Sequence, residues 1–344
     1  MTRRVAITGV GLVSCQGVGR AAHAALGPPR LDETSFAPFP IHPLPPLPEW
    51  EASIPRREWR QMENWQRLGA YAAGLAIADA DARALAPEMD LMVAAGGGER
   101  DIALDTAILS ALPALPEEAR EAHIARALAE GLRPTLFLAQ LSNLMAGSIS
   151  ILHGVGGSSR TLMGEEAAGA EALRIAHARI AAGTSRAVLV GAALIAGRWD
   201  EIITYAPVLH RGPFAPVAER QGMIRGSMAA FLLLEPLEEA LARGAAPLAL
   251  LCAVATAAGA PEERAARLAA LPGGDGALSA APFAGPGVAG ALCIADSLGH
   301  GMEAAFPMAV AIGALRVAAG EQRLGVQGFG HALGEFAAVL EAVR

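Results

Sequence analysis

The side chains that most often act as nucleophiles are scarce in this chain. Of its 344 residues only three are cysteines, Cys15, Cys252 and Cys293, and every one of the 27 basic residues is arginine. Because Schiff-base chemistry, pyridoxal phosphate enzymes and P-loop nucleotide binding all need a lysine amine, the sequence excludes these three classes. The cysteines lie far apart, with no Cys-x-x-Cys pair and no Cys/His cluster. We therefore predict no disulfide framework, no metal site and no cofactor.

The composition indicates a packed globular protein with no affinity for polyanions. Hydrophobic residues make up 53% of the chain, charged residues 18%, and the formal net charge is −7. A negative net charge argues against a nucleic acid partner. Two uncharged stretches, 244–261 and 276–295, consist mostly of Ala and Gly and are interrupted by proline, so we expect no membrane insertion. The N-terminal residues lack the pattern of a cleaved signal, and we expect a cytoplasmic protein.

The spacing of apolar residues predicts alternating strands and helices. Residues 4–8 have the pattern of a short buried strand ended by the glycines that follow. Residues 61–82 predict an amphipathic helix, and a strand is expected at 91–95. The segment 27–49 holds eight prolines, which predicts a surface loop without regular helix or sheet. Further helical patterns cover residues 102–112, 116–132 and 141–153.

Two twenty-residue segments of the chain repeat each other. Gly164–Gly183 and Gly301–Gly320 align without a gap at an offset of 137, and 10 of their 20 positions are identical. Each is followed by an arginine and then by a predicted strand, at 185–194 and 322–330. The simplest account is a duplicated strand–helix–strand unit, which gives two similar halves about a pseudo-twofold axis. Alternating strands and long helices indicate an α/β layered fold.

Motifs along the whole chain resemble, in order, those of the β-ketoacyl-acyl-carrier-protein synthases. The resemblance implies the thiolase-like fold, a duplicated αβαβα layered arrangement of two pseudo-twofold-related halves. We expect these halves at 1–205, with the Pro-rich loop, and at 206–344. The matching segments are RRVAITGVGLVSCQG (3–17), RQMENWQRLGAYAAGLAIADA (60–80), LMAGSISILHGVGG (144–157), RGPFAPVAERQGMIRGSMAAFLLLEPLEEALARGA (211–245), SLGHGMEAA (297–305) and QGFGHALGEF (327–336).

The catalytic groups of that family are mostly missing. Its members resemble one another in a cysteine nucleophile at a helix N-terminus, two histidines and a lysine. In this sequence the nucleophile position holds Glu166, and the later histidine is His300. The lysine position holds Ala295, and no histidine lies between His210 and His300. The three cysteines fall in apolar or glycine-rich runs, where Cys usually acts as a small hydrophobe. The sequence thus leaves open whether the chain is an enzyme.

Glu166 allows several interpretations. It can be a structural carboxylate favoured by the helix dipole, by roughly 0.3–1 kcal/mol. It can be a decarboxylating residue, as glutamine is in some relatives, or it can attack a thioester. His300 is either an inherited packing residue or a working base. By resemblance, the residues around the pocket and gate are Glu303, Phe306, Gly328, Phe329, Gly330 and His331, and the bulk of Glu303, Phe306 and His331 is expected to narrow the pocket.

The resemblance favours a catalytically degenerate subunit, similar to the chain-length factors of aromatic polyketide and aryl-polyene pathways. Such a subunit of type II fatty acid or polyketide biosynthesis would pair with an active ketosynthase as a heterodimer, or with itself, and would meet an acyl carrier protein. The alternatives are a stand-alone malonyl-carrier-protein decarboxylase or acyl transferase that uses Glu166 and His300, and a carrier-protein-binding scaffold. The expected interface strand is Ser158, Ser159, Arg160, Thr161, Leu162 and Met163.

Overall fold

A single mixed sheet of eleven strands organises the molecule. The computed structural model describes residues 2–134, 136–274 and 276–344. The strand order is β11-β10-β12-β13-β9-β1-β8-β6-β4-β5, with β2 paired to β1. The strands are β1 (Val5–Ser14), β2 (Gly17–Val18), β4 (Asp90–Ala94), β5 (Ser159–Leu162), β6 (Val188–Leu194), β8 (Met228–Pro236), β9 (Ala249–Ala257), β10 (Leu278–Ser279), β11 (Leu292–Cys293), β12 (Arg323–Phe329) and β13 (Glu335–Glu341).

Ten strands of the sheet form two sets of five, which are joined where β1 pairs with β9. One set is β5-β4-β6-β8-β1, and the other is β9-β13-β12-β10-β11. This junction is short, because β1 pairs with β9 only at Ala6 with Leu250 and at Ile7 with Ala249. A right-handed twist accumulates across so many strands, so the two sets can turn toward each other and enclose helices.

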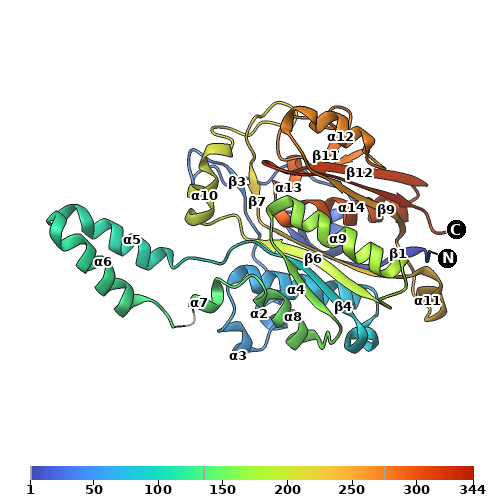
Figure 1. The fold of residues 1–344 in the computed structure, drawn as a ribbon, viewed down its shortest axis with the longest axis horizontal. Helices are drawn as coiled ribbons and strands as arrows, with labels where there is room; N and C mark the ends of the chain where they lie inside the picture. The colour runs from blue at the N-terminus through green and yellow to red at the C-terminus, as the bar shows by residue number, and fades with distance from the viewer. Residues whose placement is uncertain (1, 135, 275) are drawn as a thin grey trace.

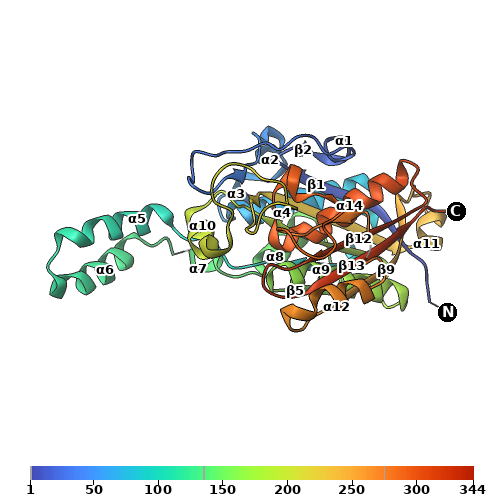
Figure 2. The same cartoon turned by 90° about the horizontal axis from the view of Figure 1, so that it is seen from above.

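The repeated segments form the two helices enclosed between the strand sets. These are α9 (Glu165–Ala181) and α14 (Ala305–Ala318), which pack against each other and contact strands of both sets. Every residue of α14 except Arg316 and Ala318 is buried. On the outer faces, α4 (Asn64–Asp79) and α8 (Leu144–His153) cover the first set, and α12 (Arg264–Ala270) covers the second (Figures 1 and 2). The predicted duplicated αβαβα layering is therefore confirmed.

The first strand is longer than expected, because its glycines do not end it. β1 continues through Gly9 and Gly11 to Ser14. A Cβ atom at Gly11 would lie 1.8 Å from the carbonyl oxygen of Ala72 in α4. The glycines therefore let helix and strand approach closely, which is a common reason for glycine inside a strand. The expectation that they would terminate the strand was wrong.

The Pro-rich segment is mostly irregular, but it is not wholly without regular structure. Its residues Ile41–His42 form β3, which pairs in parallel with β7 (Arg225–Gly226). A short helix, α2 (Pro48–Ser53), begins at a proline, which the first turn of a helix tolerates. The prediction that proline excludes helix and sheet was wrong at these two places, because β3 is short and buried and Pro48 stands at the helix start.

The remaining helices connect and decorate the layers. No helix in the described part of the chain is long and apolar enough to span a membrane. Two helices, α5 and α6, form an arm that projects far from the body (Figure 1). The bounds are α1 (Gly19–His23), α3 (Arg56–Trp59), α5 (Ile102–Ala111), α6 (Glu117–Gly131), α7 (Leu136–Ala139), α10 (Trp199–Tyr205), α11 (Leu237–Ala242) and α13 (Ala295–Leu298).

Strand β8 lies among the strands of the N-terminal half although it follows residue 205. It pairs with β1 on one side and with β6 on the other. The expected boundary at 205/206 would separate it from both neighbours. We propose that the second half begins after α11, near residue 244, because β9 is the first strand of the other set.

Replacement of Gly11 by alanine should destabilise the protein by about 3 kcal/mol or more, since the new methyl group must displace the α4 backbone rather than a flexible side chain. The free energy of unfolding in urea measures this. Gly147 in α8 is the matched control, because a Cβ atom there meets nothing within 4 Å. Gly147→Ala should leave stability unchanged or raise it by about 0.5–1 kcal/mol. Equal effects of the two variants would contradict the close packing of β1 and α4.

Candidate functional site

Glu166 lies at the first turn of α9, deep between the strand sets. The helix begins at Glu165, and the φ angles of 140° at Gly164 and 55° at Glu165 make a sharp turn after β5. The side chain of Glu166 is 1% exposed. A carboxylate at this end of a helix is favoured by the dipole, but its burial is costly unless hydrogen bonds replace the lost water.

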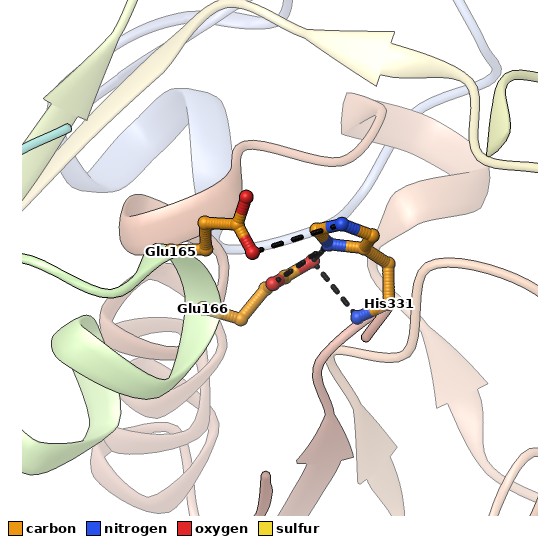
Figure 3. A group of neighbouring side chains, drawn as sticks. All are labelled: Glu165, Glu166 and His331. Atoms are coloured by element: carbon orange, nitrogen blue, oxygen red, sulfur yellow. Dashed lines mark hydrogen bonds and ion pairs between the residues drawn. The ribbon is translucent and has the colours of Figure 1, made fainter. Parts of the chain in front are cut away.

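Two histidines supply those hydrogen bonds. Nε2 of His300 lies 2.8 Å from Oε1 of Glu166. His331 approaches from the loop after β12, with its backbone N–H 3.2 Å from Oε1 and its Nδ1 3.1 Å from both carboxylate oxygens (Figure 3). The structure thus brings together Glu166, His300 and His331, which are 134 and 165 residues apart in the sequence.

The two histidines differ in protonation. Burial is the largest effect on His300, and despite the attraction of Glu166 the net result is a lowered pKa. Its Nδ1 has no partner among the described residues. A neutral ring with the proton on Nε2 leaves only a lone pair unsatisfied there, whereas a charged ring would bury an unpaired N–H.

The pKa of His331 moves in the opposite direction. Burial alone would lower its pKa, but the hydrogen bond to Glu166 and the charges of Glu166 and Glu165 outweigh that effect and raise it. For Glu166 burial would raise the pKa, yet the hydrogen bonds from both histidines bring it below the ordinary range. The pKa shifts thus favour an ionised Glu166, a neutral His300 and a protonated His331.

The ring of His331 bridges two carboxylates. While Nδ1 faces Glu166, Nε2 lies 3.7 Å from Oε2 of Glu165, and Tyr205 donates its hydroxyl to Oε1 of Glu165 at 3.0 Å. Glu165, Glu166 and His331 each offer one atom that could bind a metal ion, and these three atoms lie within 4.8 Å of one another. However, the two ring nitrogens point at different carboxylates, and one ion can bind only one of them. This geometry fits an imidazolium between two anions better than a metal site.

The loop expected to form the gate follows β12 and is hydrogen-bonded to the rest of the chain. Gly328 and Phe329 end β12, Gly330 follows the strand, and the ring of Phe329 is fully buried. A Cβ atom at Gly330 would lie 2.0 Å from the carbonyl oxygen of Leu333, so the loop folds back tightly there. The guanidinium of Arg264 stacks 4.8 Å from the centre of the Phe329 ring.

A buried carboxylate holds the far end of the gate loop. Glu335 is 1% exposed and accepts hydrogen bonds from Arg264 at 3.2 Å and from Arg267 at 2.7 and 2.9 Å. Arg264 also donates to the carbonyl oxygen of Ala332. Sequence analysis missed Arg264, Arg267 and Glu335, because nothing in their spacing shows that α12 packs beside β13.

Glu303 and Phe306, which were expected to narrow the pocket, are both buried but make different contacts. Phe306 packs its ring 4.8 Å from that of Phe336 within the core. Glu303, in the 3₁₀ turn η5 (Met302–Ala304), faces the glycine turn after β4, where a Cβ atom on Gly96 would lie 2.8 Å from its Oε1. Burial is the largest cause of its raised pKa, about 7.

None of the three cysteines is activated. Burial is the largest cause that raises the pKa of each thiol to about 11. Cys15 has a histidine nearby, with Sγ 3.7 Å from Nδ1 of His42. Burial lowers the pKa of His42 to about 3, so it does not stabilise a thiolate as a cation would. Cys15 and Cys293 are buried, as expected of small hydrophobes, whereas Cys252 is exposed.

Comparison with known proteins supports the resemblance seen in the motifs. The model of the β-ketoacyl synthase N-terminal domain matches residues 46–240. No curated protein matches the sequence. The structure is similar to one described as the ishigamide ketosynthase/chain length factor, with 19% identity, a TM-score of 0.78 and full coverage of both chains.

Two further solved structures share the fold at the same level of identity. One is described as a type II PKS acyl-carrier protein in complex with its ketosynthase bound to the hexaketide, with 19% identity, a TM-score of 0.74 and full coverage of both chains. The other is a β-ketoacyl synthase from Burkholderia phymatum STM815, with 19% identity, a TM-score of 0.72, and 99% and 100% coverage.

The His331 pair should make stability depend on pH. Because folding raises the pKa of His331 above its unfolded value near 6.5, its contribution is complete below about pH 6.5 and is lost as pH rises through the folded pKa. His331→Gln should therefore cost roughly 1.5–3 kcal/mol at pH 6 and clearly less at pH 9, measured by urea unfolding. His210→Gln, outside the cluster, is the control. A cost that does not change with pH would contradict a charged His331.

Glu303 should also make stability depend on pH, in the direction opposite to that of a carboxyl group whose pKa is lowered by folding. Its folded pKa of about 7 lies above the usual 4.5, so wild-type stability is lost as pH rises from 4.5 to 7. At 1.36 kcal/mol for each pKa unit, Glu303→Gln should be more stable than wild type by about 3 kcal/mol at pH 8, and nearly equal to it at pH 5. The same unfolding series measures this. Equal stability at pH 8 would show that Glu303 is hydrated or paired.

Proposed function

The chain belongs to the β-ketoacyl synthase family, and we propose that it is a catalytically degenerate, chain-length-factor-like subunit of type II fatty acid or polyketide biosynthesis. In this role it pairs with an active ketosynthase, which supplies the cysteine nucleophile. The observation that carries the proposal is the state of Glu166. At the position that resembles the nucleophile's, it is buried, ionised and hydrogen-bonded on both oxygens by His300 and His331.

Such a carboxylate is unsuited to the reactions that the family catalyses. An attack on a thioester needs a free lone pair and an approach path, whereas Glu166 uses its oxygens to accept hydrogen bonds. As a decarboxylating residue it would stand as an anion beside the malonyl carboxylate and repel it in a medium of low dielectric constant. Both properties favour the degenerate subunit over a decarboxylase or acyl transferase that acts alone.

The fastened gate also favours an inert site. His331 ties one end of the gate loop to Glu166, and Arg264 and Arg267 tie the other end to the sheet through Glu335. Entry of an acyl chain past Phe329 would have to break charge-assisted hydrogen bonds in buried surroundings, at roughly 1.5–3 kcal/mol each. This is the behaviour of a rigid partner rather than of a pocket that opens in each cycle.

Strand β5 is suited to pairing with another chain. Among the strands described, it has a neighbour on one side only, β4, and Ser159 and Arg160 are exposed. An open edge strand is a ready template for a partner's strand. Large apolar side chains are exposed next to it: Ile151 of α8, which packs beside β5, is 76% exposed, and Met163, which follows β5, is 66% exposed. Exposed apolar side chains beside an open edge mark an interaction surface.

The projecting arm offers a second apolar surface. Between α5, α6 and α10 lies a groove of about 430 Å³, lined largely by carbon. Its exposed side chains include Leu109, Trp199 and Ile203. The ketosynthase/chain length factor and the carrier-protein complex among the similar structures are named as assemblies, which supports a ketosynthase and an acyl carrier protein as partners here.

Native mass spectrometry of the tagged protein, co-expressed with a cysteine-bearing ketosynthase from its own source, tests the pairing. We expect a one-to-one complex. Replacing Ile151 and Met163 together by Asp should weaken it at least tenfold, because two charges would be buried against the partner. Leu241→Asp is the matched control, since Leu241 is also exposed but lies on α11, away from β5 (Figure 2).

A homodimer without the ketosynthase, or equal affinity of both variants for the ketosynthase, would overturn the proposed interface on the β5 face.

Catalytic activity is tested separately with malonyl-carrier protein and the isolated chain. We expect no release of CO₂ and no acyl adduct on this chain. Release of CO₂ that disappears in Glu166→Ala would overturn the inert assignment and favour the decarboxylase. Carrier binding that survives changes at Glu166 and on the β5 face, without a ketosynthase complex, would favour the scaffold.

A further inference from the structure

A small polar cavity lies beside the Glu166 cluster, between the ends of β4 and β6 and the turn η5. Its volume is about 40 Å³. One water needs roughly 10–15 Å³, so the cavity has room for about three groups of that size. The polar side chains that line it are Trp65, Arg198, Glu201, Tyr205, Arg225 and Glu303.

Two of these side chains hold hydrogen-bond donors without a partner in the described part of the chain. They are Nε1 of Trp65 and both Nε and Nη1 of Arg225. Trp65 is 4% exposed and Arg225 is 1% exposed, so bulk water does not reach these atoms. Indole and guanidinium nitrogens can only donate. A buried donor left unpaired costs about 1–3 kcal/mol, so three around one cavity indicate a missing acceptor.

The two arginines of the cavity are already paired with carboxylates. Arg225 stacks 4.5 Å from the centre of the Tyr205 ring and pairs with Glu201 through Nη2. Arg198 pairs with Asp200 and lies 3.6 Å from Glu99. A bare anion would therefore add an uncompensated negative charge, which is unfavourable in a buried site.

Protonation of Glu303 can compensate the negative charge of a bound anion. It is buried, and no side-chain donor hydrogen-bonds to it among the residues described. The charged groups that act on it are Arg225 of β7, Glu166 of α9 and Glu201 of α10. With burial as the largest cause and a pKa of about 7, it takes up a proton easily, and the protonated form becomes a further donor toward the cavity.

We propose that this cavity binds a short monocarboxylate, of the size of formate or acetate, that accepts hydrogen bonds from Arg225 and Trp65 and shares a proton with Glu303. Binding brings in one negative charge from the ligand and one proton from solvent. The charge of the buried site is therefore unchanged, and the orphaned donors gain the acceptor that they lack. The proposal concerns the cavity alone and does not depend on pairing with a ketosynthase.

Calorimetric titration of the full chain with sodium formate at pH 8 tests the site. Titrations in phosphate and in Tris, whose ionisation enthalpies differ, count the protons taken up. We expect saturable binding with uptake of nearly one proton for each formate. Trp65→Phe keeps the ring but removes the donor, and should weaken binding about 10- to 100-fold. Trp50→Phe is the matched control, because Nε1 of Trp50 is also buried and unpaired but lies outside this cavity.

Glu303→Gln tests proton uptake separately from formate binding, because glutamine cannot take up the proton. The variant should still bind formate, more weakly, but with no difference between the two buffers. No saturable binding up to millimolar formate would overturn the proposal and leave the cavity to water. Binding that is equally strong in Trp65→Phe, or that takes up no proton in the wild type, would place formate elsewhere and would also overturn it.

Discussion

A single buried anion connects the parts of this molecule that are far apart in sequence. Glu166 begins the central helix of the first repeat, His300 precedes the central helix of the second, and His331 belongs to the gate loop. The carboxylate is stable in the interior only because both imidazoles donate to it. Loss of either donor would leave part of a buried charge unsatisfied, a change that costs about 1.5–3 kcal/mol for a hydrogen bond to a charged group. The alignment of the two halves and the closed gate therefore depend on one ion pair.

The internal repeat places a second glutamate at the equivalent position of the second half. Glu166 and Glu303 are separated by the repeat offset of 137, and both are buried. Their pKa values nevertheless move in opposite directions, because Glu166 accepts hydrogen bonds from two imidazoles, while for Glu303 the effect of burial outweighs the attraction of Arg225. The same residue type at the same place in a duplicated fold is thus ionised in one half and easily protonated in the other.

Much of this arrangement could be predicted from the sequence, and the rest could not for physical reasons. The repeat, the motifs and the strand and helix periodicity indicated the layered fold, and the motifs located Glu166, His300 and the gate. The role of Gly11 could not be foreseen, because it depends on how closely α4 approaches β1. The contact of His331 with Glu166, and the cavity formed by Trp65 and Arg225, arise from folds of the chain that bring distant segments together.

The arm made by α5 and α6 has few contacts of its own with the core. Helix α6 has no buried residue, and α5 buries only Ile108. Isolated helices of this length are marginally stable in water, since most helical stability in proteins comes from packing. Any chain that covers the arm must therefore also supply the free energy that orders it. Association through this surface is coupled to local folding, which lowers the affinity gained for each unit of buried area and ties it to temperature and to helix-stabilising solvents.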